Sequence, residues 1–110
     1  MSQKELLKGN TETLLLSLLA VESMHGYRIV REIERRSSGY FRFKEGTLYP
    51  ALHRLEATGL IQGDWVEGIT GTSRRSYTIT PKGHQVLEER LEEWRRFSRA
   101  VNLITPTWAS

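Results

Sequence analysis

The chain of 110 residues carries 16 Lys and Arg against 13 Asp and Glu, for a formal net charge of +3, and it contains no cysteine. The absence of cysteine excludes a disulfide framework and every thiolate metal or catalytic site. The length predicts one domain, and the charge fits an anionic partner without identifying one.

Two helices are predicted before residue 40. The first begins at Asn10, which can cap it, and its broad apolar face consists of Leu14, Leu15, Leu18, Leu19 and Val21. Because this run is too short to span a bilayer, we expect a cytoplasmic protein with no membrane partner. The second helix begins near Tyr27 and is closed by Ser37-Ser38-Gly39. Its arginines can pair with Glu32 or Glu34, so they form an ordinary solvated face.

A third helix follows an aromatic connector. Its core stripe consists of Leu48, Leu52 and Leu55, at positions i, i+4 and i+7. Pro50 leaves its start open, because Thr47 as the N-cap would place the proline in the first turn, whereas a start at Glu45 would require a kink or a tight first turn. The remaining faces carry Thr47, Tyr49, His53, Arg54 and Glu56.

A β-hairpin and a final helix complete the predicted elements. Strands are expected at 61–67 and 76–79, joined by a five-residue tip at 68–72. Thr80 can cap the last helix, with Pro81 at its first position. Steps of four and three residues predict a seam for a partner helix, formed by Leu87, Leu91, Trp94, Ser98 and Val101 and flanked by Phe97 and Ile104.

Five short motifs, in this order and spacing, resemble the PadR family of bacterial transcriptional regulators over roughly residues 5 to 100. They are Leu6-Leu7-Lys8-Gly9-Asn10, His25-Gly26-Tyr27, the block from Glu45 to Leu55, Arg74-Arg75-Ser76-Tyr77 and Thr80-Pro81-Lys82-Gly83. The single final helix is similar to that of the short PadR subfamily. The resemblance implies a mainly α fold with a small β-hairpin, in which residues 1–80 form a winged helix-turn-helix, 81–104 a dimerisation helix and 105–110 a tail.

The resemblance implies a homodimer that binds a roughly palindromic double-stranded DNA operator and mostly represses. Each subunit would offer both its third helix and its wing to one half-site. The expected DNA-binding residues are Tyr27, Arg28, Lys44, Thr47, Tyr49, His53, Arg54, Arg74 and Arg75. The expected dimerisation residues are Leu87, Leu91, Trp94, Phe97, Val101 and Ile104.

Trp94 has two interpretations. In drug-sensing members of the short subfamily, a tryptophan at a similar position stacks on flat aromatic ligands in a pore between the final helices, which implies a small planar aromatic effector here. The plain alternative is that Trp94 is interface core beside Leu91 and Phe97. Glu92 and Glu93 would favour a cationic aromatic if a pore exists.

Other residues also have plain alternatives. Tyr49 and Tyr77 can simply pack where helix and wing meet, and His25 fits a turn. The chain shows no Ser, His and Asp grouping, no phosphate-binding glycine loop and no metal-ligand spacing, so we expect neither an enzyme nor a metal or other cofactor. The competing function is a winged-helix module that binds an acidic protein. DNA binding that weakens steeply with salt and prefers one sequence would discriminate the two functions.

Overall fold

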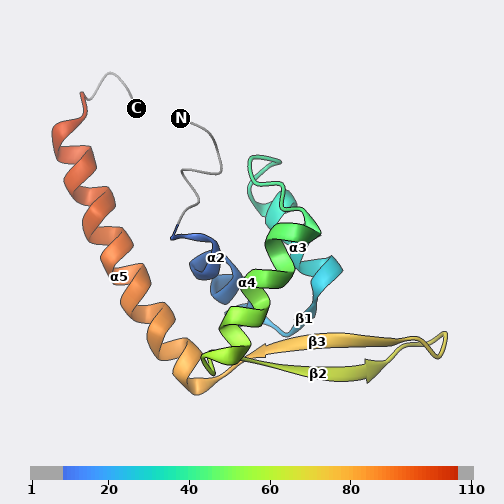
Figure 1. Cartoon of the computed structure of the whole chain (residues 1–110). Coiled ribbons are helices and arrows are strands. Elements are labelled where there is room, and N and C mark those ends of the chain that lie inside the picture. The colour runs from blue at the N-terminus through green and yellow to red at the C-terminus, as the bar shows by residue number, and fades with distance from the viewer. Residues whose placement is uncertain (1–8, 107–110) are drawn as a thin grey trace.

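The computed structural model describes residues 9–106, so the motif residues Leu6, Leu7 and Lys8 and the tail beyond Pro106 lie outside the described residues. Three helices form a body, the wing projects from one side of it, and a long helix rises from the other (Figure 1). The elements in chain order are α2 (Thr11–Val21), β1 (Met24–His25), α3 (Gly26–Arg36), α4 (Glu45–Ala57), β2 (Ile61–Glu67), β3 (Ser73–Ile79) and α5 (Pro81–Ile104).

Helix α2 is the hub of the core, as its apolar face predicts. It contacts α3, α4, α5 and β3. Its buried residues are Leu15, Leu16, Leu18 and Leu19. Two details differ from expectation. Val21 is exposed at the end of the helix, and Asn10 occupies the N-cap position without making a side-chain capping hydrogen bond.

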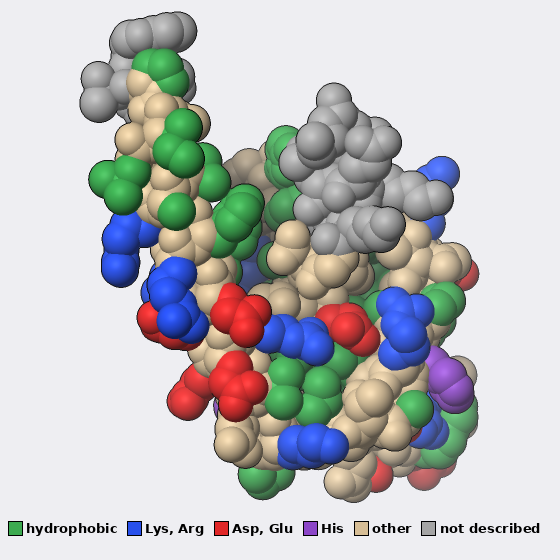
Figure 2. Space-filling view, turned by 60° about the vertical axis from the view of Figure 1, so that its left-hand side comes forward, with side chains coloured by type: hydrophobic (Ala, Val, Ile, Leu, Met, Phe, Trp, Pro, Cys, Tyr) green, Lys and Arg blue, Asp and Glu red, His purple; other side chains and the backbone are tan. Residues whose placement is uncertain are grey.

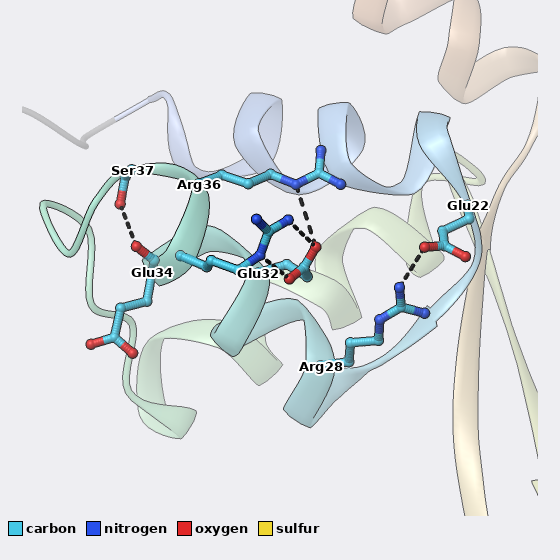
Figure 3. Close-up of polar contacts among 7 residues, drawn as sticks. Glu22, Arg28, Glu32, Glu34, Arg36 and Ser37 are labelled. Atoms are coloured by element: carbon cyan, nitrogen blue, oxygen red, sulfur yellow. Dashed lines mark hydrogen bonds and ion pairs between the residues drawn. The ribbon is translucent and has the colours of Figure 1, made fainter.

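Helix α3 buries Ile29 and Ile33 and turns its arginines outward. Figure 3 shows how this outer face is paired: Arg36 approaches Glu32, and Arg28 approaches Glu22. Arg35 lies 2.8 Å from Glu32, and its hydrogen bond is the largest cause that lowers the pKa of Glu32 to about 2. The predicted solvated and internally paired face is therefore confirmed.

Helix α4 begins at Glu45, which settles the alternatives for Pro50 in favour of the longer helix. The first turn is tight, because the backbone N–H groups of Thr47 and Leu48 both donate to the Lys44 carbonyl, at 2.9 and 3.0 Å. Pro50 lies inside the helix, where it cannot donate to the carbonyl four residues earlier. The predicted core stripe is confirmed, and the buried residues are Leu48, Ala51, Leu52 and Leu55.

The sheet has three antiparallel strands in the order β1-β3-β2, whereas only a hairpin was expected. The two long strands pair from Ile61↔Ile79 to Glu67↔Ser73, which leaves the five-residue tip at 68–72. β3 begins three residues earlier than predicted. The unexpected strand β1 is only two residues long and pairs with β3 at Tyr77 and Ser76. It ties the start of α3 to the base of the wing.

Helix α5 starts as predicted, with the Thr80 hydroxyl accepting a hydrogen bond from the Gly83 N–H at 3.0 Å. Gly83 lies against the start of β2, and a Cβ at this position would be 2.1 Å from the carbonyl oxygen of Leu60, the residue before that strand. One turn later Leu87 is buried in the core. Within residues 9–106, no helix has both the length and the apolar composition that a membrane crossing requires.

Candidate nucleic-acid interface

A hollow of about 550 Å³ lies between the wing and the amino-terminal ends of α3 and α4. Four of the predicted DNA-binding residues line it, namely Tyr27, Tyr49, Arg74 and Arg75. Arg75 is half-buried and the other three are exposed. The structure thus brings residues from α3, α4 and β3 to one place, although they lie far apart in the sequence.

Two of the three tyrosines that line this hollow, Tyr77 and Tyr49, have different surroundings. Tyr77 is only 5 % exposed, and burial, followed by the Glu56 carboxylate, raises the pKa of its hydroxyl. Tyr49 is 45 % exposed, yet its hydroxyl oxygen would lie 2.8 Å from a Cβ at Gly26. Gly26 therefore gives Tyr49 room to lie across the start of α3. The packing interpretation describes Tyr77, whereas Tyr49 both packs and faces the hollow.

His25 has a more defined place than a turn residue. It is the N-cap of α3, and its Nδ1 accepts a hydrogen bond from the Arg28 N–H at 3.3 Å. In a neutral imidazole the proton then sits on Nε2. Nε2 lies 3.2 Å from the Arg74 Nη1, within hydrogen-bond distance, and in the other tautomer it accepts from this guanidinium. The exposed Arg74 guanidinium keeps further N–H donors for an anion.

Arg75 also lines the hollow, but its guanidinium reaches α4. Its Nη2 lies 2.6 Å from the Glu56 carboxylate on α4, and that hydrogen bond is the main cause that raises the pKa of Arg75. Sequence reasoning placed Glu56 only on an outer face of the third helix. The partners are 19 residues apart, so no local spacing encodes their contact.

Two further predicted DNA-binding arginines are paired with carboxylates. Arg28 contacts Glu22, and Arg54 lies 3.7 Å from Glu12. Glu12 also binds Arg90 of α5, so Arg54 faces α2 and α5 rather than the hollow beside the wing. The other predicted contacts, Lys44, Thr47 and His53, are exposed on or just before α4.

The far half of α5 is the second surface of interest. Figure 2 shows apolar side chains along the part of this helix that stands clear of the body. Trp94 and Phe97 stack at 6.0 Å between ring centroids, and both are more than half exposed. Exposure continues through Val101, Leu103 and Ile104. Of the predicted dimerisation residues, Leu87 requires correction, because it is 6 % exposed within the subunit's own core and cannot face a partner.

A groove of about 400 Å³ runs beside Trp94, between α5 and the start of α2. Phe97 forms part of its apolar wall. Glu12 and Glu93 add carboxylates, and Arg90 adds a cation that Glu12 pairs at 3.6 Å. The groove therefore combines stacked aromatic rings with a Glu93 carboxylate, which are the groups that attract a planar cation.

Known proteins are similar to this chain in sequence and in architecture. The transcriptional regulator PadR-like family matches residues 15–89. Transcriptional regulator Rv3488 of Mycobacterium tuberculosis is 36% identical over 87 residues, which cover 79% of this chain and 78% of the relative.

Solved structures agree. A transcriptional regulator from Clostridium thermocellum superposes with a TM-score of 0.84 at 31% identity, covering 93% of this chain and 99% of the other. A PadR-like transcriptional regulator from Bacillus cereus gives 0.79, at 31% identity and with the same coverage. The neighbours share the winged-helix architecture, and the family match spans more than half of the chain. The chain therefore belongs to the PadR-like family of transcriptional regulators.

Proposed function

We propose that this PadR-like regulator is a repressor that binds a roughly palindromic operator as a homodimer. The observation that carries the proposal is the pairing of two exposed surfaces: a groove-sized helix beside a basic wing, and an apolar helix end without a cover in the described chain. In this scheme residues 1–80 read DNA, residues 81–104 join the subunits, and residues 105–110 form a tail.

The DNA contacts divide by chemistry. Exposed Thr47, Tyr49 and His53 on α4 are suited to the major groove, because a helix of this width enters it and small or hydrogen-bonding side chains reach base edges. Phosphate contacts fall to cationic and hydroxyl groups around it. These groups are Tyr27, Lys44 and Arg74, together with Arg28 and Arg54, which would exchange the carboxylates of Glu22 and Glu12 for phosphate.

Arg74 is the phosphate contact with the most direct support. Its guanidinium is exposed on the wing, with Nη1 3.2 Å from the His25 Nε2, and it pairs with no carboxylate in the described chain. Its remaining N–H donors can bind a phosphate oxygen, which also carries a negative charge. Arg74→Ala should therefore weaken binding to all sequences and reduce the salt slope by about one. An unchanged slope would remove Arg74 from the phosphate contacts.

The exposed residues of α5 support dimerisation. Trp94, Phe97, Leu103 and Ile104 are 51 to 85 % exposed. Contiguous apolar surface of this kind marks an interaction site on a soluble domain. A second copy would cover it with an identical patch, as two-fold symmetry requires, and the angle between subunits would set the half-site spacing.

An effector would act through the same contact between the subunits. The groove beside Trp94 and Glu93 suits a small planar aromatic cation, and it lies where α5 leaves the body. Such a ligand changes operator affinity only if it binds the two subunit angles with different affinity. The repressor would leave its operator if the ligand favours an inter-subunit angle at which the spacing of the two α4 helices no longer matches the two half-sites.

Fluorescence anisotropy on labelled duplexes tiled across the upstream region of the protein's own gene tests the proposal. We expect one tile to bind tightly at near-physiological salt in the presence of nonspecific competitor, and affinity to fall steeply as salt rises. Weak binding without preference for any tile, even when the tiles extend to neighbouring promoters, would contradict sequence-specific regulation. The winged helix would then serve to bind an acidic protein.

A further inference from the structure

The Arg75 side chain bridges the wing to α4 at the point where the hairpin leaves the body. β1 pairs with β3 at Tyr77 and Ser76, so Arg75 is the first residue beyond that support. Its Nη2 lies 2.6 Å from one carboxylate oxygen of Glu56, and its Nε lies 3.4 Å from the other. Glu56 is in the last turn of α4. The ion pair therefore fixes the hairpin to this helix.

Two residues of β2 position the guanidinium of Arg75. Trp65 is directly opposite Arg75 in the register, and the Arg75 Cζ lies 5.6 Å from the centroid of its ring system. Gly63 provides the space, because a Cβ there would be 2.6 Å from the Arg75 Nε. A lone glycine inside a strand often marks such a close approach. Any larger residue would push the guanidinium off β2 and away from Glu56.

We propose that Glu56 and Arg75 are positioning residues, which hold the wing at a fixed angle to α4, and that Arg75 is not a DNA contact. We call Glu56, Arg75, Trp65 and Gly63 the wing clamp. The proposal rests on the DNA-binding function above and reassigns one of its expected contacts. Arg74, one residue earlier, lies beside the His25 imidazole instead and pairs with no carboxylate in the described chain.

The clamp matters because helix and wing must engage DNA together. A two-stranded ribbon twists easily when only its base is anchored. Wrong wing positions lose the phosphate contacts that set the register of α4 in its groove. Fixing the angle before binding reduces the ordering cost of association. The clamp thus contributes to operator affinity and preference without touching DNA.

Glu56→Gln separates the two roles of Arg75, because it removes the carboxylate charge and keeps the shape of the side chain. If Arg75 were a DNA contact restrained by Glu56, its release would strengthen binding and make the salt slope steeper by about 0.9. If Arg75 positions the wing, binding should weaken with an unchanged slope. Glu67→Gln is the matched control, since Glu67 is exposed on the same hairpin and makes no ion pair in the described chain.

A measurement without DNA comes first. ¹⁵N relaxation of the amides at 68–72 and of the Trp65 indole reports wing motion in the wild type, Glu56→Gln, Arg75→Gln and the double variant. We expect both single variants to increase the motion equally, the double variant to add nothing, and Glu67→Gln to match the wild type. Exchanging the two charges, as Glu56→Arg with Arg75→Glu, should restore part of the order. Unchanged motion in Glu56→Gln would overturn the clamp.

Anisotropy then compares the preferred upstream duplex with a scrambled duplex of equal length. For Glu56→Gln we expect the ratio of the two affinities to fall roughly two- to fivefold, the range of a partly exposed ion pair, at constant salt slope. A steeper slope with tighter binding would overturn the proposal. If motion responds as expected but no duplex is preferred by any variant, the clamp stands and the proposed DNA-binding function fails.

Discussion

The two halves of α5 have the same helical geometry and opposite surroundings. In the first half, Gly83 and Leu87 are buried against the sheet and the core. In the second half, Trp94, Phe97 and Leu103 are exposed, although the sequence has more large apolar residues there than in the first half. Burial against the body stabilises the first half. The comparison teaches that the exposed apolar residues of the second half contribute little to the subunit's own fold, so they require another explanation.

A substitution where α5 joins the body should give the largest effect, which is a loss of stability. In Gly83→Ala the added Cβ would lie 2.1 Å from the Leu60 carbonyl oxygen and 2.7 Å from the Ile79 side chain, and backbone cannot move aside cheaply. We expect a loss on the order of 3 kcal/mol in the free energy of unfolding, measured by urea denaturation.

Gly46→Ala is the control for this change, since nothing lies within 4 Å of a Cβ at that position of α4. It should leave stability unchanged or raise it by up to about 1 kcal/mol, the difference in helix propensity. Equal stability of the two variants would show that α5 is not docked tightly at Gly83.

The second half of α5 should respond in assembly rather than in stability. Phe97→Glu places a charge in the exposed aromatic pair and should convert dimer to monomer in sedimentation velocity. Losing the second half-site should lower operator affinity roughly 10²-fold or more. Arg99→Gln, exposed on the same helix and two residues away, changes the net charge by the same one unit and is the control. A dimer that persists in Phe97→Glu would place the interface elsewhere.

Trp94 gives a test of the second half of α5 in which the expected effect is smaller. Tryptophan fluorescence should be quenched by planar aromatic drugs, more strongly by cationic than by neutral ones, because Glu93 lines the same groove. Trp94→Ala should abolish the quenching. If quenching persists in this variant, the drug binds near Trp65 or Trp108, the latter being outside the described residues, and Trp94 is interface core.

The sequence predicts the regular parts of the fold because they rest on local periodicity. The stripe of Leu48, Leu52 and Leu55 and the α5 span of 81–104 are confirmed. Strand β1 was missed, because two residues are too short to show an alternating pattern. Its partner is Tyr77 of β3, and such pairing across more than fifty residues is a property of the assembled fold.

The candidate site was predicted less completely, for the same physical reason. Exposure of Thr47, Tyr49 and Arg74 follows from helix and strand periodicity. The difference between Arg74 and Arg75 depends on where Glu56 lies in space, which spacing along the chain cannot provide. Gly63 was the one available signal, as a glycine within an otherwise regular strand.

The body should differ from the projecting helix in its response to acid, and this effect should be the smallest. Arg35 and Arg36 lower the pKa of Glu32 from 4.5 to about 2 in the folded protein. A carboxylate with a lowered pKa stabilises the fold above its unfolded value, so this contribution is complete above pH 4.5 and is lost as pH falls toward 2. Glu32→Gln should flatten the stability curve in that window, measured by thermal unfolding.

Arg35→Gln should reproduce much of the change, because the Arg35 hydrogen bond is the largest cause of the lowered pKa. Both variants should keep the wild-type sedimentation coefficient, since Glu32 and Arg35 lie on α3 and not on the exposed half of α5. If acid instead dissociates the dimer at the same pH in wild type and both variants, the acid response belongs to the interface. The body and the projecting helix would then not be separable in this way.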